Sequence, residues 1–179
     1  MPRAATSATT LLLYPLAGLS LLLSGAIFGF FYAWVCSTMW GLDAADPRIA
    51  IPAMQAMNAS VRNIVFAPAF FGTPFVLLLT AAVAHAAGRS RPALLLAAAG
   101  LLYLVGGMIL TIGVNVPMNQ ALAQLATPES HAAAAEIWAG YSPRWQVFNV
   151  IRTLVSGLVL LLSGWAILLL GRNAPLTPA

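Results

Sequence analysis

A stripe of aromatic and polar residues in the C-terminal third has the spacing of one helical face. Its members are Trp138, Tyr141, Trp145, Asn149 and Arg152. Residues three, four or seven positions apart lie on the same side of an α-helix, although Pro143 favours a kink or a helix start within the run. An interfacial aromatic belt would explain Trp138 and Tyr141 equally well. Arg152 is different, because a cation inside an apolar span requires a partner or an anionic ligand.

Amide side chains form a second polar group. Asn115 and Asn119 flank Pro117 at the end of an apolar run, and Gln55 and Asn58 lie in an earlier polar segment. Proline frees backbone carbonyls, which the two asparagines could cap. Alternatively, the asparagines supply donors and acceptors to a pocket opposite Gln55 and Asn58. The residues leave both interpretations open.

Metal and thiol chemistry receive little support. Cys36 is the only cysteine, which excludes an internal disulfide, a CxxC pair and a thiolate metal cage. His85 and His131 fall at opposite ends of the expected bundle, and the sequence lacks the E-x-x-H pairs of di-iron bundles and a facing pair of haem histidines. We therefore expect no metal and no cofactor.

Membrane helices must position these residues. The 179 residues are 61% hydrophobic and 7% charged, whereas about a quarter of the residues in a soluble domain are charged. A bilayer is crossed by roughly 20 apolar residues, and four runs are long enough: 11–39, 64–87, 93–116 and 146–170. We predict an all-α, integral membrane four-helix bundle forming a single domain over residues 1–179. Short amphipathic helices are expected in the loops after the first and third spans, and a disordered tail over 173–179.

Local signals add detail to the four spans. Pro15 is expected in the first turn of the first span, and the sequence Gly72–Pro74 should bend the second. The short polar segment 88–91 predicts that the second and third spans are antiparallel neighbours. Helical segments are expected on both sides of Thr127 and Pro128.

The charges indicate orientation rather than a polymer partner. Eight arginines, no lysines and four acids give a net charge of +4. The arginines are scattered, which argues against nucleic acid, and flank the spans as membrane proteins require. One side carries both termini and four arginines without an acid: Arg3, Arg89, Arg91 and Arg172. We predict that this side is cytoplasmic, in a bacterial inner (plasma) membrane with lipid around the helices.

Several short motifs resemble the anthrone oxygenase-like family of small membrane proteins. They are GFFYAW (29–34), MWGL (39–42), MQAMN (54–58), TIGVNVPMN (111–119) and W-x2-Y-x3-W-x3-N-x2-R (138–152). Ile64 departs from the family pattern, where proline is expected. The resemblance implies a four-helix bundle that oxidises an anthrone to an anthraquinone with O2, without an evident cofactor.

Two functional hypotheses follow. In a cofactor-independent oxygenase acting on a small hydrophobic aromatic molecule, Trp138, Tyr141 and Trp145 would form an aromatic wall. Arg152, Asn115 and Asn149 would stabilise an oxyanion, Asp43 would act as the base, and Asn119, Asn58 and Gln55 would bind substrate. In the alternative, a non-enzymatic membrane module binds a lipid or quinone, or serves as a partner subunit. The sequence does not decide between them, and a homo-oligomer is compatible with either.

Overall fold

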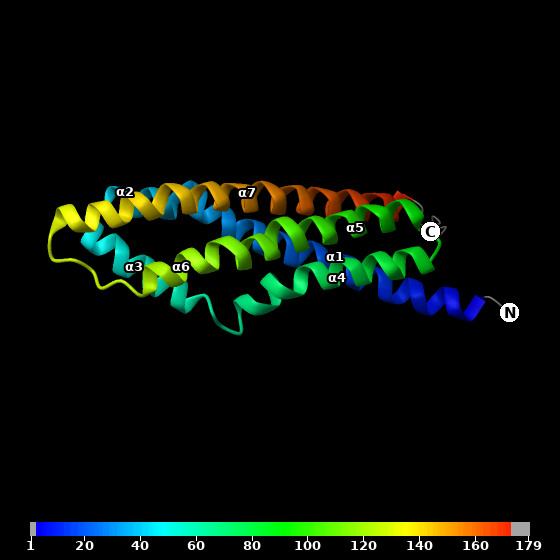
Figure 1. Ribbon diagram of the computed structural model, residues 1–179. Helices are drawn as coiled ribbons and strands as arrows, with labels where there is room; N and C mark the ends of the chain where they lie inside the picture. The colour runs from blue at the N-terminus through cyan, green and yellow to red at the C-terminus, as the bar shows by residue number, and fades with distance from the viewer. Residues whose placement is uncertain (1–2, 173–179) are drawn as a thin grey trace.

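Long helices make up nearly all of the computed structural model, which describes residues 3–172 (Figure 1). The helices are α1 (Arg3–Ala33), α2 (Met39–Ala44), α3 (Pro47–Ser60), α4 (Phe66–Ala86), α5 (Ser90–Tyr103), α6 (Val116–Ala123) and α7 (His131–Arg172). Three π-helical segments interrupt them: η1 (Trp34–Thr38), η2 (Leu104–Ile109) and η3 (Thr111–Asn115). No strand occurs within residues 3–172.

Four helical runs in the described part of the chain are long and apolar enough to cross a membrane. They cover Leu11–Ala44, Phe66–Ala86, Ser90–Ala123 and His131–Arg172. In the bundle, α1 contacts α4 and α7, and α5 contacts the same two helices. This arrangement confirms the predicted all-α membrane bundle and makes the protein a multi-pass membrane protein.

Small and hydroxylated residues hold the bundle helices together. The hydroxyls of Ser20 in α1 and Thr80 in α4 are hydrogen-bonded at 2.9 Å, which is a common interhelical link in membranes. Around them lies a buried apolar core that includes Ile27, Phe31, Leu77, Leu96 and Tyr103. The hydroxyl of Tyr103 donates to the carbonyl oxygen of Phe70 at 3.1 Å, so even this large buried polar group has a partner.

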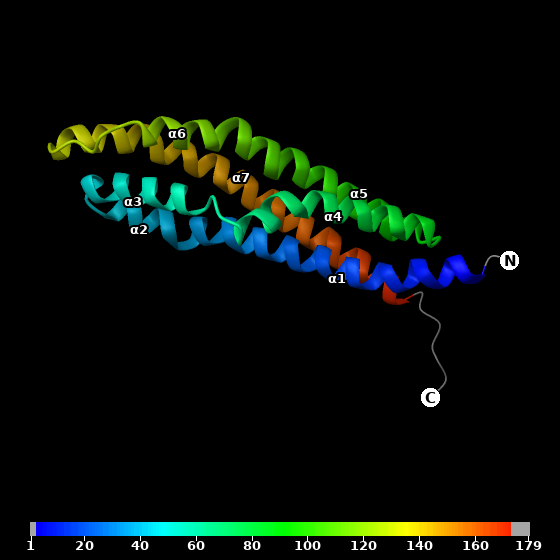
Figure 2. The same ribbon diagram turned by 90° about the horizontal axis from the view of Figure 1, so that it is seen from below.

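The end of the bundle opposite the α4–α5 hairpin is longer than the bilayer requires. Helix α4 has 21 residues and is therefore about 31 Å long, close to the thickness of the hydrocarbon core. Helices α2, α3 and α6 and the start of α7 extend beyond it (Figures 1 and 2). They enclose a second apolar cluster, which includes Met39, Met54, Leu122, Trp138 and Trp145.

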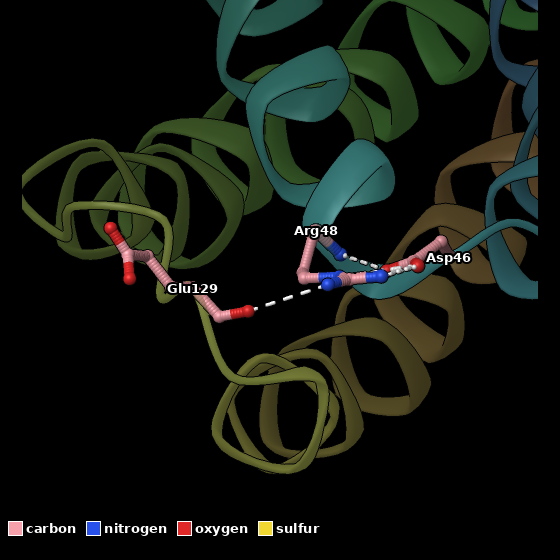
Figure 3. A network of polar contacts seen from close by, with 3 residues as sticks. All are labelled: Asp46, Arg48 and Glu129. Atoms are coloured by element: carbon pink, nitrogen blue, oxygen red, sulfur yellow. Dashed lines mark hydrogen bonds and ion pairs between the residues drawn. The ribbon is translucent and has the colours of Figure 1, made fainter.

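Helix α3 begins with an ionic N-cap. The carboxylate of Asp46 accepts a hydrogen bond from the backbone N–H of Arg48 at 2.9 Å, and Pro47 occupies the first turn. The guanidinium of Arg48 binds the same carboxylate at 2.6 Å and donates to the carbonyl oxygen of Glu129 at 3.4 Å (Figure 3). The cap therefore links the start of α3 to the loop between α6 and α7.

Prolines modify the helices less than their positions suggest. Pro15 lies well inside α1, which begins at Arg3, so the prediction that it marks the first turn is wrong. Pro143 lies inside an unbroken α7, and the five residues of the stripe are all buried.

The helical segments expected beside Thr127 and Pro128 are present, but they continue the third and fourth spans. The predicted tail, 173–179, falls outside the described residues.

Candidate functional site

An aromatic pocket of about 590 Å³ lies where α3 meets the end of the four-helix bundle. Its aromatic lining consists of Phe30, Phe31, Trp34, Phe66, Phe70, Phe71 and Trp145. Its polar lining consists of Asn58, Arg62, Asn63, Thr111, Asn119 and Arg152. Neither an acid nor a histidine is among the lining residues. The pocket is therefore an apolar chamber with amide, hydroxyl and guanidinium groups.

Arg152 is the buried cation of this pocket. It is 4% exposed, and its guanidinium donates to the hydroxyl of Thr111 at 3.2 Å and to the side-chain oxygen of Asn149 at 3.0 Å. Its Cζ lies 4.7 Å from the ring centroid of Phe31 and 5.3 Å from that of Trp145. The rings attract the cation, but Nε has no hydrogen-bond partner. Within residues 3–172, no carboxylate is paired with this guanidinium.

Asn119 joins three helices at the polar end of the pocket. Its oxygen accepts from the hydroxyl of Tyr141 at 2.8 Å and from Nε1 of Trp145 at 2.9 Å, and its nitrogen donates to the side-chain oxygen of Asn58 at 2.9 Å. These partners set the direction of the amide. They also orient the ring of Trp145, which packs against Trp34 with centroids 5.1 Å apart.

Two further asparagines are buried outside the pocket lining. The amide nitrogen of Asn149 donates to the carbonyl oxygen of Phe31 at 3.1 Å, which fixes the amide oxygen that Arg152 binds. Asn115 is 1% exposed, and neither atom of its amide has a partner. It ends the π-helical segment that starts at Thr111, and π-helical insertions are frequent at functional sites.

Six of the predicted site residues do not line the pocket: Asp43, Gln55, Asn115, Trp138, Tyr141 and Asn149. The carboxylate of Asp43 accepts from Nε1 of Trp138 at 2.9 Å, from the hydroxyl of Ser142 at 2.6 Å and from the amide of Gln146 at 2.8 Å. The amide of Gln55 donates to the carbonyls of Leu122 at 2.8 Å and Leu125 at 3.0 Å. Asp43, Trp138 and Gln55 therefore hold together the projecting helices, which are α2, α3, α6 and the start of α7. The hydroxyl of Tyr141 is hydrogen-bonded to two lining residues, Asn119 and Asn58, but Tyr141 itself is not part of the lining.

The sequence hypotheses overlooked most of the aromatic wall. Phe30, Phe31 and Trp34 belong to the GFFYAW motif, but aromatic residues are common in any membrane helix. Phe66 and Phe70 lie one turn apart at the start of α4, stacked with centroids 5.3 Å apart. That spacing is the local signal that could have identified them.

A smaller pocket of about 460 Å³ adjoins the first. The two pockets share six lining residues: Phe30, Trp34, Met57, Val61, Asn63 and Phe66. The rest of the smaller pocket is lined from α1, α3 and the start of α4 and is almost entirely apolar. The two pockets therefore adjoin along these shared residues, and the smaller one is an apolar recess lined from α1, α3 and α4.

Fold and pocket together define the class: a four-helix membrane protein with an aromatic, cation-containing chamber at one end of its spans. Residues 63–162 match the family model described as Anthrone oxygenase, and because the match covers more than half of the chain, the chain belongs to this family. The matched region includes Asn115, Asn119, Trp145 and Arg152. A search of curated proteins and a search of solved structures each gave no match.

Proposed function

We propose that this protein oxidises an anthrone-type or related aromatic polyketide molecule with O2, using no metal and no organic cofactor. The observation that carries the proposal is Arg152, a buried cation that lines an aromatic pocket and has no carboxylate partner among residues 3–172. Such a group is costly unless a ligand supplies negative charge. Membership of the anthrone oxygenase family supports an oxygenase-like role.

The chemistry needs an anion and O2. Loss of a proton from the CH2 group of an anthrone gives an enolate, which transfers one electron to O2 to form a carbon radical and superoxide. These combine to a peroxide anion at the same carbon, which takes up a proton to give the hydroperoxide. Loss of water then leaves the carbonyl, so that anthrone plus O2 gives anthraquinone plus water. One oxygen atom enters the product and the other leaves as water.

The pocket residues would favour the enolate. The guanidinium of Arg152 lies against Phe31 and Trp145, so a flat ring system stacked on these side chains would bring its oxygen to the cation. Stabilising developing negative charge in a low-dielectric site is an effective way to lower a reaction barrier. Asn115, which is buried outside the pocket lining, is not assigned a contact with the substrate. Because the lining has no acid or histidine, we propose that water at the pocket mouth accepts the proton, in place of Asp43.

Oxygen uptake by purified protein in phosphatidylcholine nanodiscs, with an anthrone and a metal chelator, tests the proposal. Arg152→Gln should lower kcat/KM by about 10²- to 10³-fold, the usual cost of losing one oxyanion donor. Arg144→Gln is the matched control, because Arg144 is exposed and lies outside both pockets. Wild-type rates in a folded Arg152→Gln protein would contradict the assignment. Saturable binding of an anthraquinone without oxygen uptake would instead favour the binding module.

We also propose an orientation in a bacterial plasma membrane. The α4–α5 hairpin, with Arg89 and Arg91, lies at the same end of the bundle as the end of α7, with Arg172 (Figure 1). Basic residues in short connections favour the cytoplasmic side. Both termini would then be cytoplasmic, and the pocket would lie near the outer face.

A further inference from the structure

Two arginines and no acid line the aromatic pocket. Arg152 is buried at its inner wall, and Arg62 is exposed on the loop between α3 and α4. Within the described residues, the side chain of Arg62 has neither a hydrogen bond nor an ion pair. The pocket therefore has two positive charges and nothing to balance them. A complementary ligand would carry negative charge at two places.

The loop holds Arg62 in a defined position. The side-chain oxygen of Asn63 accepts from the backbone N–H groups of Val65 at 2.8 Å and Phe66 at 2.9 Å, and its nitrogen donates to the carbonyl of Ser60 at 2.7 Å. The backbone N–H of Arg62 donates to the carbonyl of Ala59 at 3.3 Å. Since both sides of the turn are fixed, little backbone entropy would be lost when Arg62 binds a ligand.

The chamber is large enough for more than three fused rings. Pockets of about 300 to 1,000 Å³ hold drug-sized molecules, and this one has about 590 Å³. A ring system stacked beside Phe31 and Trp145 would leave room toward α3. Arg62, Asn63 and Asn58 line that side, so a polar substituent of the substrate would meet donors there.

We infer that the substrate is an aromatic acid, with an enol or phenol oxygen at Arg152 and a carboxylate bound by Arg62. The Arg152 half of this inference rests on the proposed function. A guanidinium binds a carboxylate through two parallel N–H···O bonds, which suits an exposed arginine at a pocket mouth. A lipid phosphate could supply the same anionic oxygens to Arg62. Because Arg62 lines the aromatic pocket, its position favours a substrate carboxylate over a lipid phosphate.

Ligand binding tests this without requiring turnover. In phosphatidylcholine nanodiscs, equilibrium dialysis would compare anthraquinone with an anthraquinone carboxylate, each corrected for partitioning into protein-free discs. Wild-type protein should bind the carboxylate about tenfold or more tightly, the usual effect of one charge-assisted hydrogen bond. Arg62→Gln should reduce that ratio about tenfold, and Arg62→Lys should retain part of it because lysine lacks the planar fork. The control Arg144→Gln should keep the wild-type ratio.

An unchanged ratio in Arg62→Gln would overturn the inference. Equal affinities for both probes, together with weaker binding of Arg62→Gln to phosphatidylglycerol vesicles, would assign Arg62 to lipid headgroups and would also overturn it. Absence of oxygen uptake affects only the proposed oxidation, because the affinity ratio is measured without catalysis. Conversely, oxidation of a plain anthrone by a protein that shows no carboxylate preference would leave the oxidation intact and refute the substrate class.

Discussion

At the scale of single residues, the site depends on amides that organise larger groups. Asn119 accepts hydrogen bonds from both Tyr141 and Trp145 and donates to Asn58. No aliphatic side chain can replace those three contacts. Asn149 has a similar role for Arg152, because it connects the guanidinium to the backbone of α1.

Replacing Asn119 by leucine should therefore destabilise the protein strongly. The hydroxyl of Tyr141 and the indole N–H of Trp145 would lose their acceptor, and each stranded buried group costs about 1–3 kcal/mol. Unfolding by detergent titration would measure the loss. Tyr141→Phe should cost less, and the double variant should cost less than the sum of the two. Additive effects would show that Asn119 and Tyr141 are not coupled.

At the scale of helices, close packing at Gly106 fixes the distance between the third span and α7. A Cβ atom at Gly106 would lie 2.9 Å from Cγ2 and 3.1 Å from Cγ1 of Val155. Val155 is β-branched and cannot easily rotate away. The close approach places Thr111, one turn or so further on, beside Arg152.

Gly106→Ala should accordingly lower the free energy of unfolding by about 1–3 kcal/mol, the usual cost of overpacking. The matched control is Gly113→Ala in the same span, where an added Cβ would meet nothing within 4 Å. That variant should be neutral or slightly stabilised, since alanine is the better helix former. Equal stability of the two variants in a detergent titration would show that the third span can move away from α7.

The ionic N-cap of α3 should make the projecting helices sensitive to acid. The side-chain hydrogen bond from Arg48 lowers the pKa of Asp46 from 3.8 to about 2. Because the folded carboxylate holds its proton less tightly than the unfolded one, its stabilising effect is complete above pH 4 and disappears as the pH falls toward 2. Asp46→Asn removes this titration while keeping a capping side chain. Wild type should therefore lose more stability than Asp46→Asn between pH 4 and 2; parallel curves would contradict this.

At the scale of the whole molecule, the pocket lies where the four-helix bundle meets helices α3 and α6. The apolar recess shares Phe30 and Phe66 with the chamber and is lined from α1, α3 and α4. The polar lining residues Asn58 and Asn119 belong to α3 and α6. If the proposed function holds, an aromatic substrate would enter the chamber from the membrane by this recess, with its polar groups toward Asn58 and Asn119. The side of the membrane on which this happens follows from the orientation of the spans.

Reporter fusions test that orientation. Alkaline phosphatase joined after Thr127, in the loop between α6 and α7, should be active, because we propose that this loop is periplasmic. The same reporter after Arg91, at the α4–α5 hairpin, should be inactive, because the positive residues there favour the cytoplasm. A cytoplasmic reporter such as green fluorescent protein should give the reverse pattern. Phosphatase activity at Arg91 would invert the topology.

The sequence by itself determined the class of fold and the presence of four apolar helices long enough to cross a membrane, because hydrophobicity and helical periodicity are local properties. It also identified Arg152 as needing a partner, since the cost of a charge in an apolar span does not depend on its neighbours. Only the tertiary structure decided which groups meet Arg152. Asn149 bonds to Phe31, 118 positions away, and that contact depends on how α1 and α7 are rotated and shifted against each other. The same packing placed Asp43 against Trp138 and away from the pocket. Polar residues on different helices compete for the same partners, and the pattern of one chain segment does not show which of them will meet.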